Sequence, residues 1–392
     1  MIRLRSFVGA ALAVLMIASS SSTCEWDYPI WIPHSANDDP FYRFTKGRNA
    51  GYIDRTGKVV VAAVIPSLGG NGRGTFHDGL LEIGVSDGVY INTSGKKAID
   101  IGLYRGWDFS EGLAAAMETP GGKWGYINTK GEFAISPRFA SSPTDYVWSF
   151  EGGFAAVEVA GRFGYIDHTG EFVIQPKFLD GGSFHDGMAR VIAEGPCVYL
   201  RISEESPCPD LGILPKDTKT QDPLPACKYT FVDKFGKVIS DQRYDYALPF
   251  AEGLAPVRIG KLWGYINKTG MMVIAPHFDS ASSFSDGLGL VSENGLFGYV
   301  DRTGAYVIKP EFKRAESFAE GRAVVRDADS SYWYIDHSGH QAIPDKFALA
   351  SAFFKGLAHV KVRSGAPVNE SSQTGTFAYI DGTGRTMFAY KP

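Results

Sequence analysis

The chain has 392 residues, of which 44% are hydrophobic and 21% are charged, a balance typical of a folded protein and not of a disordered one. Its 39 Lys and Arg residues against 43 Asp and Glu residues give a net charge of -4, so no basic surplus favours binding to nucleic acid. The 46 Gly and 21 Pro residues are spread over turn positions, as a fold of many short strands requires.

Residues 1–23 have the pattern of a secretory signal peptide. Arg3 and Arg5 precede an apolar stretch of 12 residues, Phe7 to Ala18, which is too short to span a bilayer, and small residues follow from Ser19 to Thr23. We therefore expect export and a soluble extracytoplasmic protein, periplasmic or secreted. No other run is long and apolar enough for a membrane span, and residues 24–40 are interpreted as a linker.

Cys24 follows this segment at the place where a lipoprotein carries its lipidated cysteine. Ser21 stands where such signals usually have Leu or another aliphatic residue. Ordinary cleavage between Ser20 and Cys24 is thus the favoured interpretation. A lipid anchor at Cys24 is the alternative, and it would be the protein's one link to a membrane.

From residue 41 to residue 392 one short phrase returns nine times: aromatic residues, an aliphatic residue, Asp or Asn, two variable residues and Gly. Gly51-Tyr52-Ile53-Asp54-Arg55-Thr56-Gly57 is the first copy. Successive copies lie 38, 36, 39, 66, 34, 34, 35 and 45 residues apart. Such a period indicates a repeat architecture with a unit of about 35 residues. The copies centre on Asp54, Asn92, Asn128, Asp167, Asp233, Asn267, Asp301, Asp336 and Asp381.

Each unit predicts three short strands, rich in β-branched and aromatic residues and bounded by Gly or Pro. Since no segment keeps a 3.6-residue period, helices should be few, and the expected class is all-β. One unit has too little apolar surface to fold alone, so the recurring aromatic residues should form a core shared by stacked neighbours; a ligand-stacking role for them is the alternative. Nine units leave a closed β-propeller-like ring and an open superhelical stack both possible.

Two positions follow from backbone physics. The Gly that closes each phrase should adopt a positive φ in a tight hairpin. The four prolines Pro137, Pro176, Pro276 and Pro310 should end the third strand, because proline cannot donate a hydrogen bond to a sheet. The eighth copy is shorter around Pro344, which predicts a local irregularity there.

Lys123-Trp124-Gly125-Tyr126-Ile127-Asn128 and the segment from Leu262 to Asn267 resemble the bacterial WG (KWG) repeat family. The downstream Val-Ile-x-Pro-x-Phe and Phe-x-x-Gly-Leu-Ala elements are similar to that family too, and the resemblance covers residues 41–392. Several copies depart from the pattern, as Trp333-Tyr334 does by lacking the Gly. The resemblance implies a propeller-like or stacked β array, mostly without known enzymatic activity.

Two insertions interrupt the turn between the first and second strands, residues 195–227 in the fifth unit and residues 364–375 in the ninth. Equivalent turns emerge on the same edge of an array, so this edge is our candidate binding face; plain surface decoration is the alternative. Cys197 and Cys227 flank the larger insertion and could form a disulfide, with Cys208 left for Cys24 or unpaired. Sequence cannot choose among the three pairings of four cysteines.

No motif for chemistry stands out. Histidines such as His77 and His185 occupy slots that other copies fill with Ser, Ala, Glu or Lys, which favours structural filler over a catalytic base. Two sets of acids recur, the Asp or Asn of the phrase and the acid of the Phe-x-Glu/Asp-Gly turn, and their regular recurrence favours turn capping. In the first set Asn replaces Asp at positions 92, 128 and 267, as capping permits. The second set lies at Asp78, Glu111, Glu151, Asp186, Glu252, Asp286 and Glu320. No metal-binding spacing or cofactor motif is present, so we expect no cofactor and no metal site.

The expected function is a non-enzymatic extracytoplasmic binding or scaffold protein. It would offer its repeat surface and inserted loops to a protein, peptide or glycan partner. The alternative from another class is an envelope hydrolase that acts on cell-wall or glycan material. A purely structural envelope component would differ from the first only in lacking a discrete partner.

Overall fold

The computed structural model describes residues 40–66, 74–83, 88–139, 147–193, 228–326, 330–363 and 375–392. Within them the chain forms strands and no helix, which confirms the all-β class. The strands group into nine antiparallel sheets, numbered here 1 to 9 in chain order. Every sheet in this part of the chain is built from consecutive strands, so no strand is shared between neighbours.

Sheet 1 holds β1 (Tyr42–Lys46), β2 (Asn49–Ile53) and β3 (Val59–Pro66), and sheet 2 holds β4 (Leu80–Glu82), β5 (Tyr90–Asn92) and β6 (Lys97–Ile99). Sheet 3 holds β7 (Arg105–Gly106), β8 (Leu113–Met117), β9 (Trp124–Asn128) and β10 (Phe133–Phe139). Sheet 4 holds β11 (Ala155–Val159), β12 (Arg162–Ile166) and β13 (Phe172–Phe178), and sheet 5 holds β14 (Asp180–His185), β15 (Met188–Ile192) and β16 (Thr230–Asp233).

Sheet 6 holds β17 (Tyr246–Ala247), β18 (Leu254–Ile259), β19 (Leu262–Asn267) and β20 (Met272–Phe278). Sheet 7 holds β21 (Ser280–Ala281), β22 (Gly289–Glu293), β23 (Leu296–Val300) and β24 (Tyr306–Phe312). Sheet 8 holds β25 (Arg314–Ala315), β26 (Ala323–Arg326) and β27 (Tyr332–Ile335), and sheet 9 holds β28 (Leu349–Ala350), β29 (Leu357–Lys361), β30 (Phe377–Asp381) and β31 (Thr386–Tyr390).

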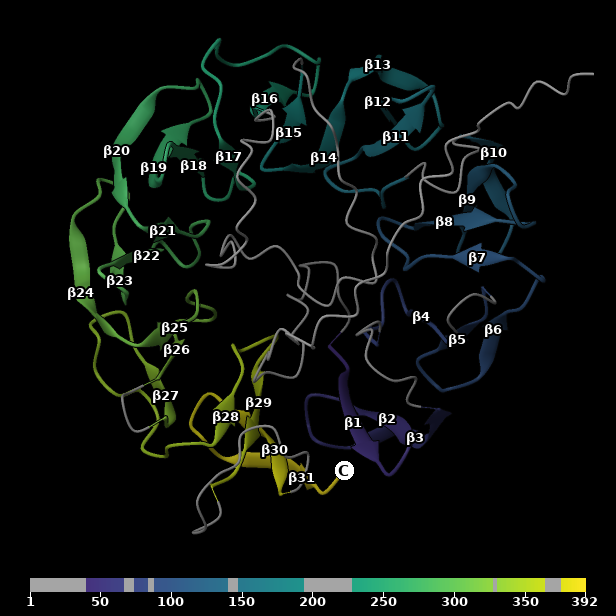
Figure 1. The fold of residues 1–392 in the computed structure, drawn as a ribbon. Coiled ribbons are helices and arrows are strands. Elements are labelled where there is room, and N and C mark those ends of the chain that lie inside the picture. Colours follow the sequence, from purple (N-terminus) through teal and green to yellow (C-terminus); the bar gives the residue numbers. More distant parts are fainter. Residues whose placement is uncertain are drawn as a thin grey trace, which may run out of the picture.

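The sheets stand side by side around a ring, with short strands such as β17 and β21 nearer the centre and β20 and β24 at the rim (Figure 1). The fold is thus β-propeller-like. The Phe-x-x-Gly-Leu-Ala element, which we expected to open the next unit, forms a turn and the start of a strand, and a short inner strand that we did not predict precedes it, as β17 precedes Phe250. Sheets 3, 6, 7 and 9 therefore have four strands where three were predicted.

The hydrophobic core lies between adjacent sheets, as the stacking argument predicts. One cluster joins Tyr126 of sheet 3 to Phe150 and Val157 of sheet 4, and the Tyr126 and Phe150 rings meet edge to face with centroids 4.9 Å apart. The same packing recurs between Tyr265 of sheet 6 and Phe284 of sheet 7, at 5.0 Å. These aromatic side chains are core residues and not an exposed stacking platform.

A buried tyrosine hydroxyl ties most sheets to the next one. The tyrosine of the repeat phrase donates a hydrogen bond to a carbonyl in the inner segment of the following sheet. Without this bond the buried carbonyl would lack a hydrogen-bond partner, which costs free energy. The hydrogen bond therefore adds to the apolar packing that holds the two sheets together. The pairs are Tyr90 with Trp107, Tyr126 with Trp148, Tyr165 with Gly182, Tyr265 with Ser282, Tyr299 with Glu316 and Tyr334 with Ser351.

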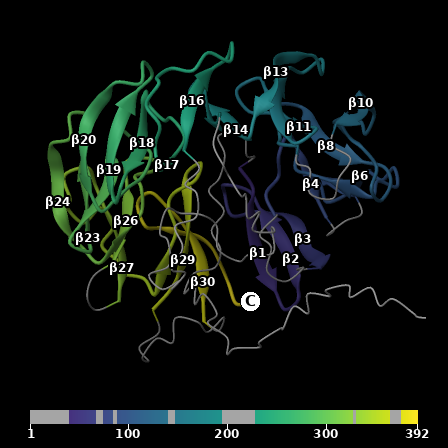
Figure 2. The ribbon, with the colours of Figure 1, turned by 45° about the horizontal axis from the view of Figure 1, so that its top comes forward.

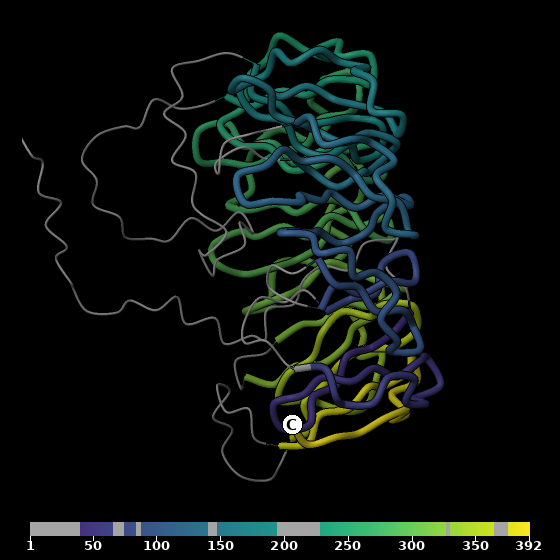
Figure 3. Tube along the Cα trace, turned by 90° about the vertical axis from the view of Figure 1, so that its right-hand side faces the viewer, coloured from purple at the N-terminus to yellow at the C-terminus, as the bar shows by residue number. Residues whose placement is uncertain are grey.

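Sheet 9 packs against sheet 1, so the ring closes and is not an open stack. Figure 2 and Figure 3 both place β1 to β3 beside the last strands. The Tyr42 hydroxyl donates to the carbonyls of Phe354 and Lys355, and the Tyr379 hydroxyl donates to the carbonyl of Arg43. Rings of Phe44 and Phe388 pack with centroids 5.0 Å apart across the same seam.

The Gly of the Trp-Gly pair is required by a bulge in the outer strand. In sheet 4, Tyr165 pairs with Ile174 and Phe163 pairs with Phe178. The outer strand β13 therefore advances by four residues between these two pairs, while β12 advances by two. The extra residues fold over Gly164, where an added Cβ would lie 2.6 Å from the Ile174 carbonyl oxygen. Any side chain would collide with backbone, which explains the Gly by close approach.

The prediction that proline ends the third strand is wrong. Pro137, Pro176, Pro276 and Pro310 lie inside β10, β13, β20 and β24, each two residues before the strand's last residue. Each sits in the bulge of the outer strand, where it interrupts edge pairing without ending the strand. A proline at an exposed sheet edge also discourages pairing with another chain.

Sheets without the Gly have a shorter outer strand. Val89, Thr230 and Trp333 occupy the Gly position in sheets 2, 5 and 8, where the outer segment is reduced to three residues or to isolated bridges. In sheet 9 this position holds Ala378, and the outer strand β31 keeps five residues. In sheet 8 only bridges such as Tyr332 to Phe347 remain. The irregularity predicted near Pro344 is thus confirmed, and Trp333 supplies its physical reason.

Candidate functional site: the two faces of the ring

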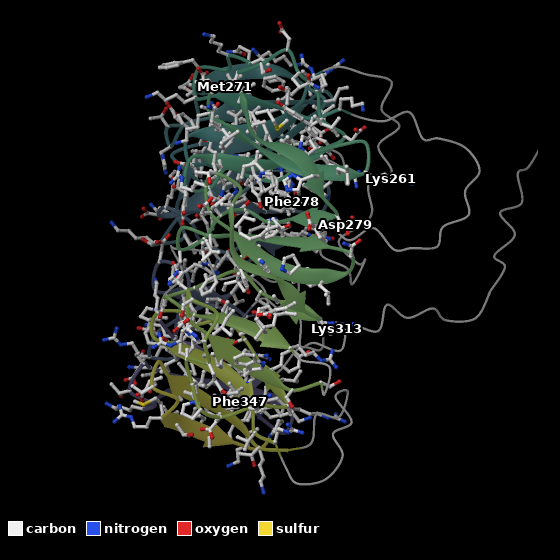
Figure 4. All side chains as sticks on the ribbon, turned by 90° about the vertical axis from the view of Figure 1, so that its left-hand side faces the viewer. Lys261, Met271, Phe278, Asp279, Lys313 and Phe347 are labelled. Carbon is white, nitrogen blue, oxygen red and sulfur yellow. The ribbon has the colours of Figure 1, made fainter. Side chains whose placement is uncertain are left out.

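Because the strands are antiparallel, successive turns alternate between the two faces of the ring. One face carries the turns that follow the strand of the repeat phrase and contain the recurring Asp or Asn, such as the turn from β19 to β20, and we call it the Asx face. The other carries the turns that precede the strand of the repeat phrase, such as the turn from β18 to β19, and the connections to the next sheet, and we call it the insertion face. Figure 4 shows Met271 on the Asx side and Lys261 and Lys313 on the opposite side.

On the Asx face, all nine Asp or Asn residues cap their own turn, as predicted. In sheet 7 the Asp301 carboxylate accepts hydrogen bonds from the N–H groups of Thr303 and Ala305 at 2.8 and 3.0 Å. These hydrogen bonds, that from the Thr303 hydroxyl first, hold the pKa of Asp301 below its usual value. The Gly after each cap has a positive φ, for example 89° at Gly304, which confirms that prediction too.

The second set of acids does not cap its own turn, and here the prediction needs correction. Their carboxylates accept a hydrogen bond from the turn Gly N–H of the next sheet, for example Glu252 from Gly287 at 3.1 Å. Six such bonds run around the face and link neighbouring sheets. They join Asp78 to Gly112, Glu111 to Gly153, Asp186 to Gly253, Glu252 to Gly287, Asp286 to Gly321 and Glu320 to Gly356.

Basic side chains of the capped turns reach back to the preceding sheet. Lys268 of sheet 6 donates to the Asp186 carboxylate of sheet 5 at 2.6 Å, and Arg302 of sheet 7 donates to the Glu252 carbonyl of sheet 6. His337 stacks on Phe318 with ring centroids 4.5 Å apart, and its Nε2 lies 3.1 Å from the Asp286 carbonyl oxygen. The position directly after the Asp or Asn of the phrase thus holds side chains of different types that each contact the preceding sheet.

Histidine–carboxylate pairs on this face belong to the same network. His168 lies 3.2 Å from Glu111, and His185 lies 3.1 Å from Glu151, each across a sheet boundary. His77 faces Asp108 at 3.9 Å. His34 lies outside the described residues. A His and an acid at hydrogen-bond distance resemble part of a catalytic constellation, but these pairs run between neighbouring sheets, and Glu111 also accepts the Gly153 N–H of sheet 4.

The two insertions leave the ring at the insertion face. The larger one lies between β15, which ends at Ile192, and β16, which begins at Thr230; the smaller one lies between β29 and β30. Both therefore interrupt the same turn of their sheets, and the strands that bracket them end on one face. Residues 195–227 and 364–374 themselves lie outside the described residues, as do residues 1–39.

Sheet 6 holds the neck of the larger insertion. Lys228 makes an ion pair with Asp245, and the same carboxylate accepts the Gly260 N–H at 2.7 Å. Burial opposes the effect, but these two partners hold the pKa of Asp245 below its usual value. The Arg190 guanidinium lies over the Tyr229 ring at 4.8 Å and donates to the Ala247 carbonyl at 2.8 Å. These contacts attach residues on both sides of the insertion, Arg190 and Lys228, to sheet 6.

The WG containing repeat family matches six segments of the chain: residues 90–122, 124–162, 163–195, 229–263, 263–297 and 297–329. Together these segments cover more than half of the sequence. The chain belongs to this family. No match is found among curated proteins. The WG pair itself now has a physical meaning, an apolar ring for the inter-sheet core next to a Gly that admits the bulge.

Among solved structures, the WG repeat ring is similar to a eukaryotic initiation factor at 11% identity and a TM-score of 0.56, covering 90% of this chain and 96% of that one. It is also similar to the computationally designed Ika8 protein at 12% identity and a TM-score of 0.39, over 72% and 85% of the two chains. BamB from Moraxella catarrhalis matches at 12% identity and a TM-score of 0.38, over 76% and 88%. The first likeness reflects the fold alone.

The described part of the WG repeat chain adds three plain findings. Its residues include no helix with the length and apolar character needed to cross a bilayer. No group of three or more His, Cys, Asp or Glu side chains in that part could hold a metal ion. Cys24, Cys197, Cys208 and Cys227 all lie outside it, so neither the disulfide pairing nor lipidation at Cys24 is tested.

Proposed function

We propose that this WG repeat protein is a non-enzymatic binding or scaffold protein that captures a protein, peptide or glycan partner at its insertion face. The observation that carries the proposal is that both long insertions interrupt the same turn and so leave the ring on one face. In a repeat array an insertion departs from what the fold itself needs, and a shared face lets two insertions contact one partner.

The hydrogen bonds and ion pairs between sheets also favour the insertion face as the binding face. On the Asx face, polar side chains already bridge sheets. On the insertion face, the tips of the turns expose apolar side chains next to cations, as Ile259 and Leu262 do beside Lys261; Phe235 and Met271 are exposed apolar side chains on the Asx face, so exposure alone does not distinguish the two faces. Mixed apolar and charged groups of this kind suit a protein or glycan partner. Val159 and Val362 add exposed apolar groups in sheets 4 and 9.

Residues 1–23 have the features of an export signal, so the partner would be met outside the cytoplasm, in the periplasm, at the envelope or in the medium. Cys24 would tie the ring to a membrane only if it is lipidated. Fractionation of cells that express the full chain tests this part. Recovery of the intact chain in the cytoplasm, with residues 1–23 still attached, would contradict it.

Two matched loop replacements test the binding face. Residues 194–227 are replaced by Asn-Gly, the pair that forms the equivalent two-residue turn of sheet 7 at Asn294 and Gly295, both with positive φ. Residues 364–374 are replaced in the same way. A labelling enzyme fused to the full-length exported protein identifies the partner of the wild type, and we expect one or both replacements to abolish its recovery while the ring still folds.

Phe235→Ser is the control on the other face, because this side chain is 77% exposed on the Asx face. It should leave recovery of the partner unchanged. Equal recovery from the wild type and from both loop replacements would remove the insertion face from consideration.

An envelope hydrolase that acts on cell-wall or glycan material is the second candidate, and one observation favours it. Burial raises the pKa of Glu316 to about 7, as a general acid requires. Its carboxyl, however, accepts the Ala352 N–H in the interface of sheets 8 and 9, away from both faces' turns. Hydrolysis of peptidoglycan by the wild type and its loss in Glu316→Gln would favour this candidate over the first.

A further inference from the structure

Sheet 9 is the sheet that closes the ring, and no strand among the described residues crosses from it into sheet 1. Hydrogen bonds from Tyr42 and Tyr379 to carbonyls and aromatic packing join the two sheets. Since all strand pairing lies within sheets, sheet 9 could leave its neighbours with its own pairing intact. The interfaces of sheet 9 with sheets 8 and 1 therefore decide whether the ring is closed.

Glu316 introduces a carboxyl group into the interface of sheets 8 and 9. One of its oxygens accepts the Ala352 N–H of sheet 9, while Oε2 is buried without a hydrogen-bond partner among the described residues. The titratable groups that face it are the hydroxyls of Tyr299 on β23 and Tyr334 on β27, and both stay neutral because burial raises their pKa values. Other sheets have no acid at this position: it holds Trp107, Trp148, Gly182, Ser282 and Ser351.

His359 introduces an imidazole on the opposite side of sheet 9, toward sheet 1. Its ring stacks on Phe377 and Tyr390, with centroids 5.4 and 5.9 Å away, and its Nε2 lies 2.9 Å from the Tyr390 hydroxyl. The groups around this cluster are Tyr379 on β30, Lys361 on its own strand, and Arg43 and Tyr42 on β1. Elsewhere the residue that pairs with the repeat tyrosine in this way is apolar in five sheets, namely Ala115, Ala156, Pro256, Leu290 and Val324. It is Arg43 in sheet 1 and Glu82 in sheet 2.

We propose that Glu316 and His359 form a pair of opposed proton-linked contacts on sheet 9, so that the closure of the ring varies little with pH. Glu316 departs from the repeat pattern, and each of the two groups lies in one of the two interfaces that sheet 9 makes. Each is accommodated there in its neutral form. Glu316 therefore weakens docking of sheet 9 as pH rises, and His359 weakens docking as pH falls.

The direction of each effect follows from proton linkage. Burial raises the pKa of Glu316 from 4.5 to about 7, so between these values the released sheet loses a proton that the docked one keeps, and release becomes easier as pH rises. Burial lowers the pKa of His359 from 6.5 to about 4, so over that range the released sheet gains a proton that the docked one lacks, and release becomes easier as pH falls. Between pH 4.5 and 6.5 both effects act, each roughly tenfold per pH unit, and they oppose each other.

Hydrogen exchange of the full-length protein measures this opening directly. The readout is the opening constant of the Ala352 amide, which bonds the Glu316 carboxyl across the interface and so exchanges when sheet 9 is released. It is followed between pH 4.5 and 6.5 and corrected for the intrinsic pH dependence of exchange. In the wild type we expect a change smaller than about threefold. In Glu316→Gln the constant should fall about 100-fold as pH rises over this range, and in His359→Leu it should rise about 100-fold.

The double variant should again show little pH dependence, and amides of β11 to β13 serve as the reference far from sheet 9. Glu311→Gln, which removes an exposed acid on β24, is the matched control and should reproduce the wild-type profile. Where Gln or Leu prevents folding, Glu316→Leu and His359→Ala repeat the test, since Leu248 and Ala115 show that the repeat accepts these residues. Wild-type slopes in both single variants, or a tenfold change per pH unit in the wild type itself, would overturn the proposal.

Discussion

Substitution of the Gly in a Trp-Gly pair should destabilise the ring through one backbone collision. At Gly264 an added Cβ would lie 2.4 Å from the Ile274 carbonyl oxygen and 2.8 Å from the Pro276 nitrogen. Atoms of this kind need well over 3 Å, and a carbonyl and a proline nitrogen cannot turn away as a flexible side chain can. The outer strand β20 must therefore shift or give up its bulge.

The magnitude follows from these two responses. A shift that keeps the strand in place is overpacking, which costs about 1–3 kcal/mol. Loss of the bulge would release the pairing of Phe278 with Trp263 and expose Phe278, which is 0% exposed now, at a cost of about 3–5 kcal/mol. We expect Gly264→Ala to lower the free energy of unfolding by about 2–4 kcal/mol.

Denaturant unfolding followed by tryptophan fluorescence measures this loss, since Trp263 lies on the strand next to the bulge. Gly182→Ala is the matched control: its φ is not positive, and an added Cβ would meet the Arg190 carbonyl oxygen at an ordinary 3.5 Å. The control should stay within about 0.5 kcal/mol of the wild type. If the two variants lose equal stability, close approach of the bulge is not the reason for the Gly.

Three further predictions concern the links between sheets. Phe231 fills the tyrosine position of sheet 5, so this sheet lacks the hydrogen bond from a tyrosine hydroxyl to the next sheet. In Phe231→Tyr the new hydroxyl should donate to the Leu248 carbonyl and raise the free energy of unfolding by about 0.5–1 kcal/mol in denaturant. No gain would mean that the hydroxyl finds no acceptor there. Glu252→Ala should cost about 1 kcal/mol by leaving the Gly287 N–H without its acceptor, and Glu252→Gln, which keeps an acceptor, should restore most of it; equal losses would contradict the bond. The lowered pKa of Asp301 means that its contribution is complete near pH 7 and is lost as pH falls through that lowered value. Asp301→Asn should therefore match the wild type at pH 7 and become the more stable of the two in acid, and acid unfolding curves that coincide would refute this.

Local features of the sequence predicted the local structure well. The cap and the Gly of each hairpin depend on side-chain and backbone atoms within about seven residues, so one phrase such as Asp301 to Gly304 contains all of their causes. The stacked core was also predictable, because a single unit cannot bury its own aromatic rings. The buried carboxyl of Glu316 was missed, although comparison of equivalent positions could have marked it as a departure from the repeat.

The two errors have different origins. The four prolines were expected to stop a strand because proline cannot donate, but a bulge between neighbouring strands of one sheet accommodates each of them, as the bulge over Gly164 does for Pro176 without ending β13. The acids were assigned to their own turns, whereas Glu252 bonds a Gly in the next sheet, and nothing within one unit distinguishes the two acceptor positions.

Each repeat carries its own strands, turns and apolar faces in its amino-acid order, and these could be derived one unit at a time. Closure into a ring could not be derived from one unit. It depends on the angle between neighbouring sheets, summed over nine interfaces, and a small change in each angle would leave the first and last sheets apart. The bond from Tyr42 to Phe354 joins residues 312 positions apart, a contact that forms only when this sum is right.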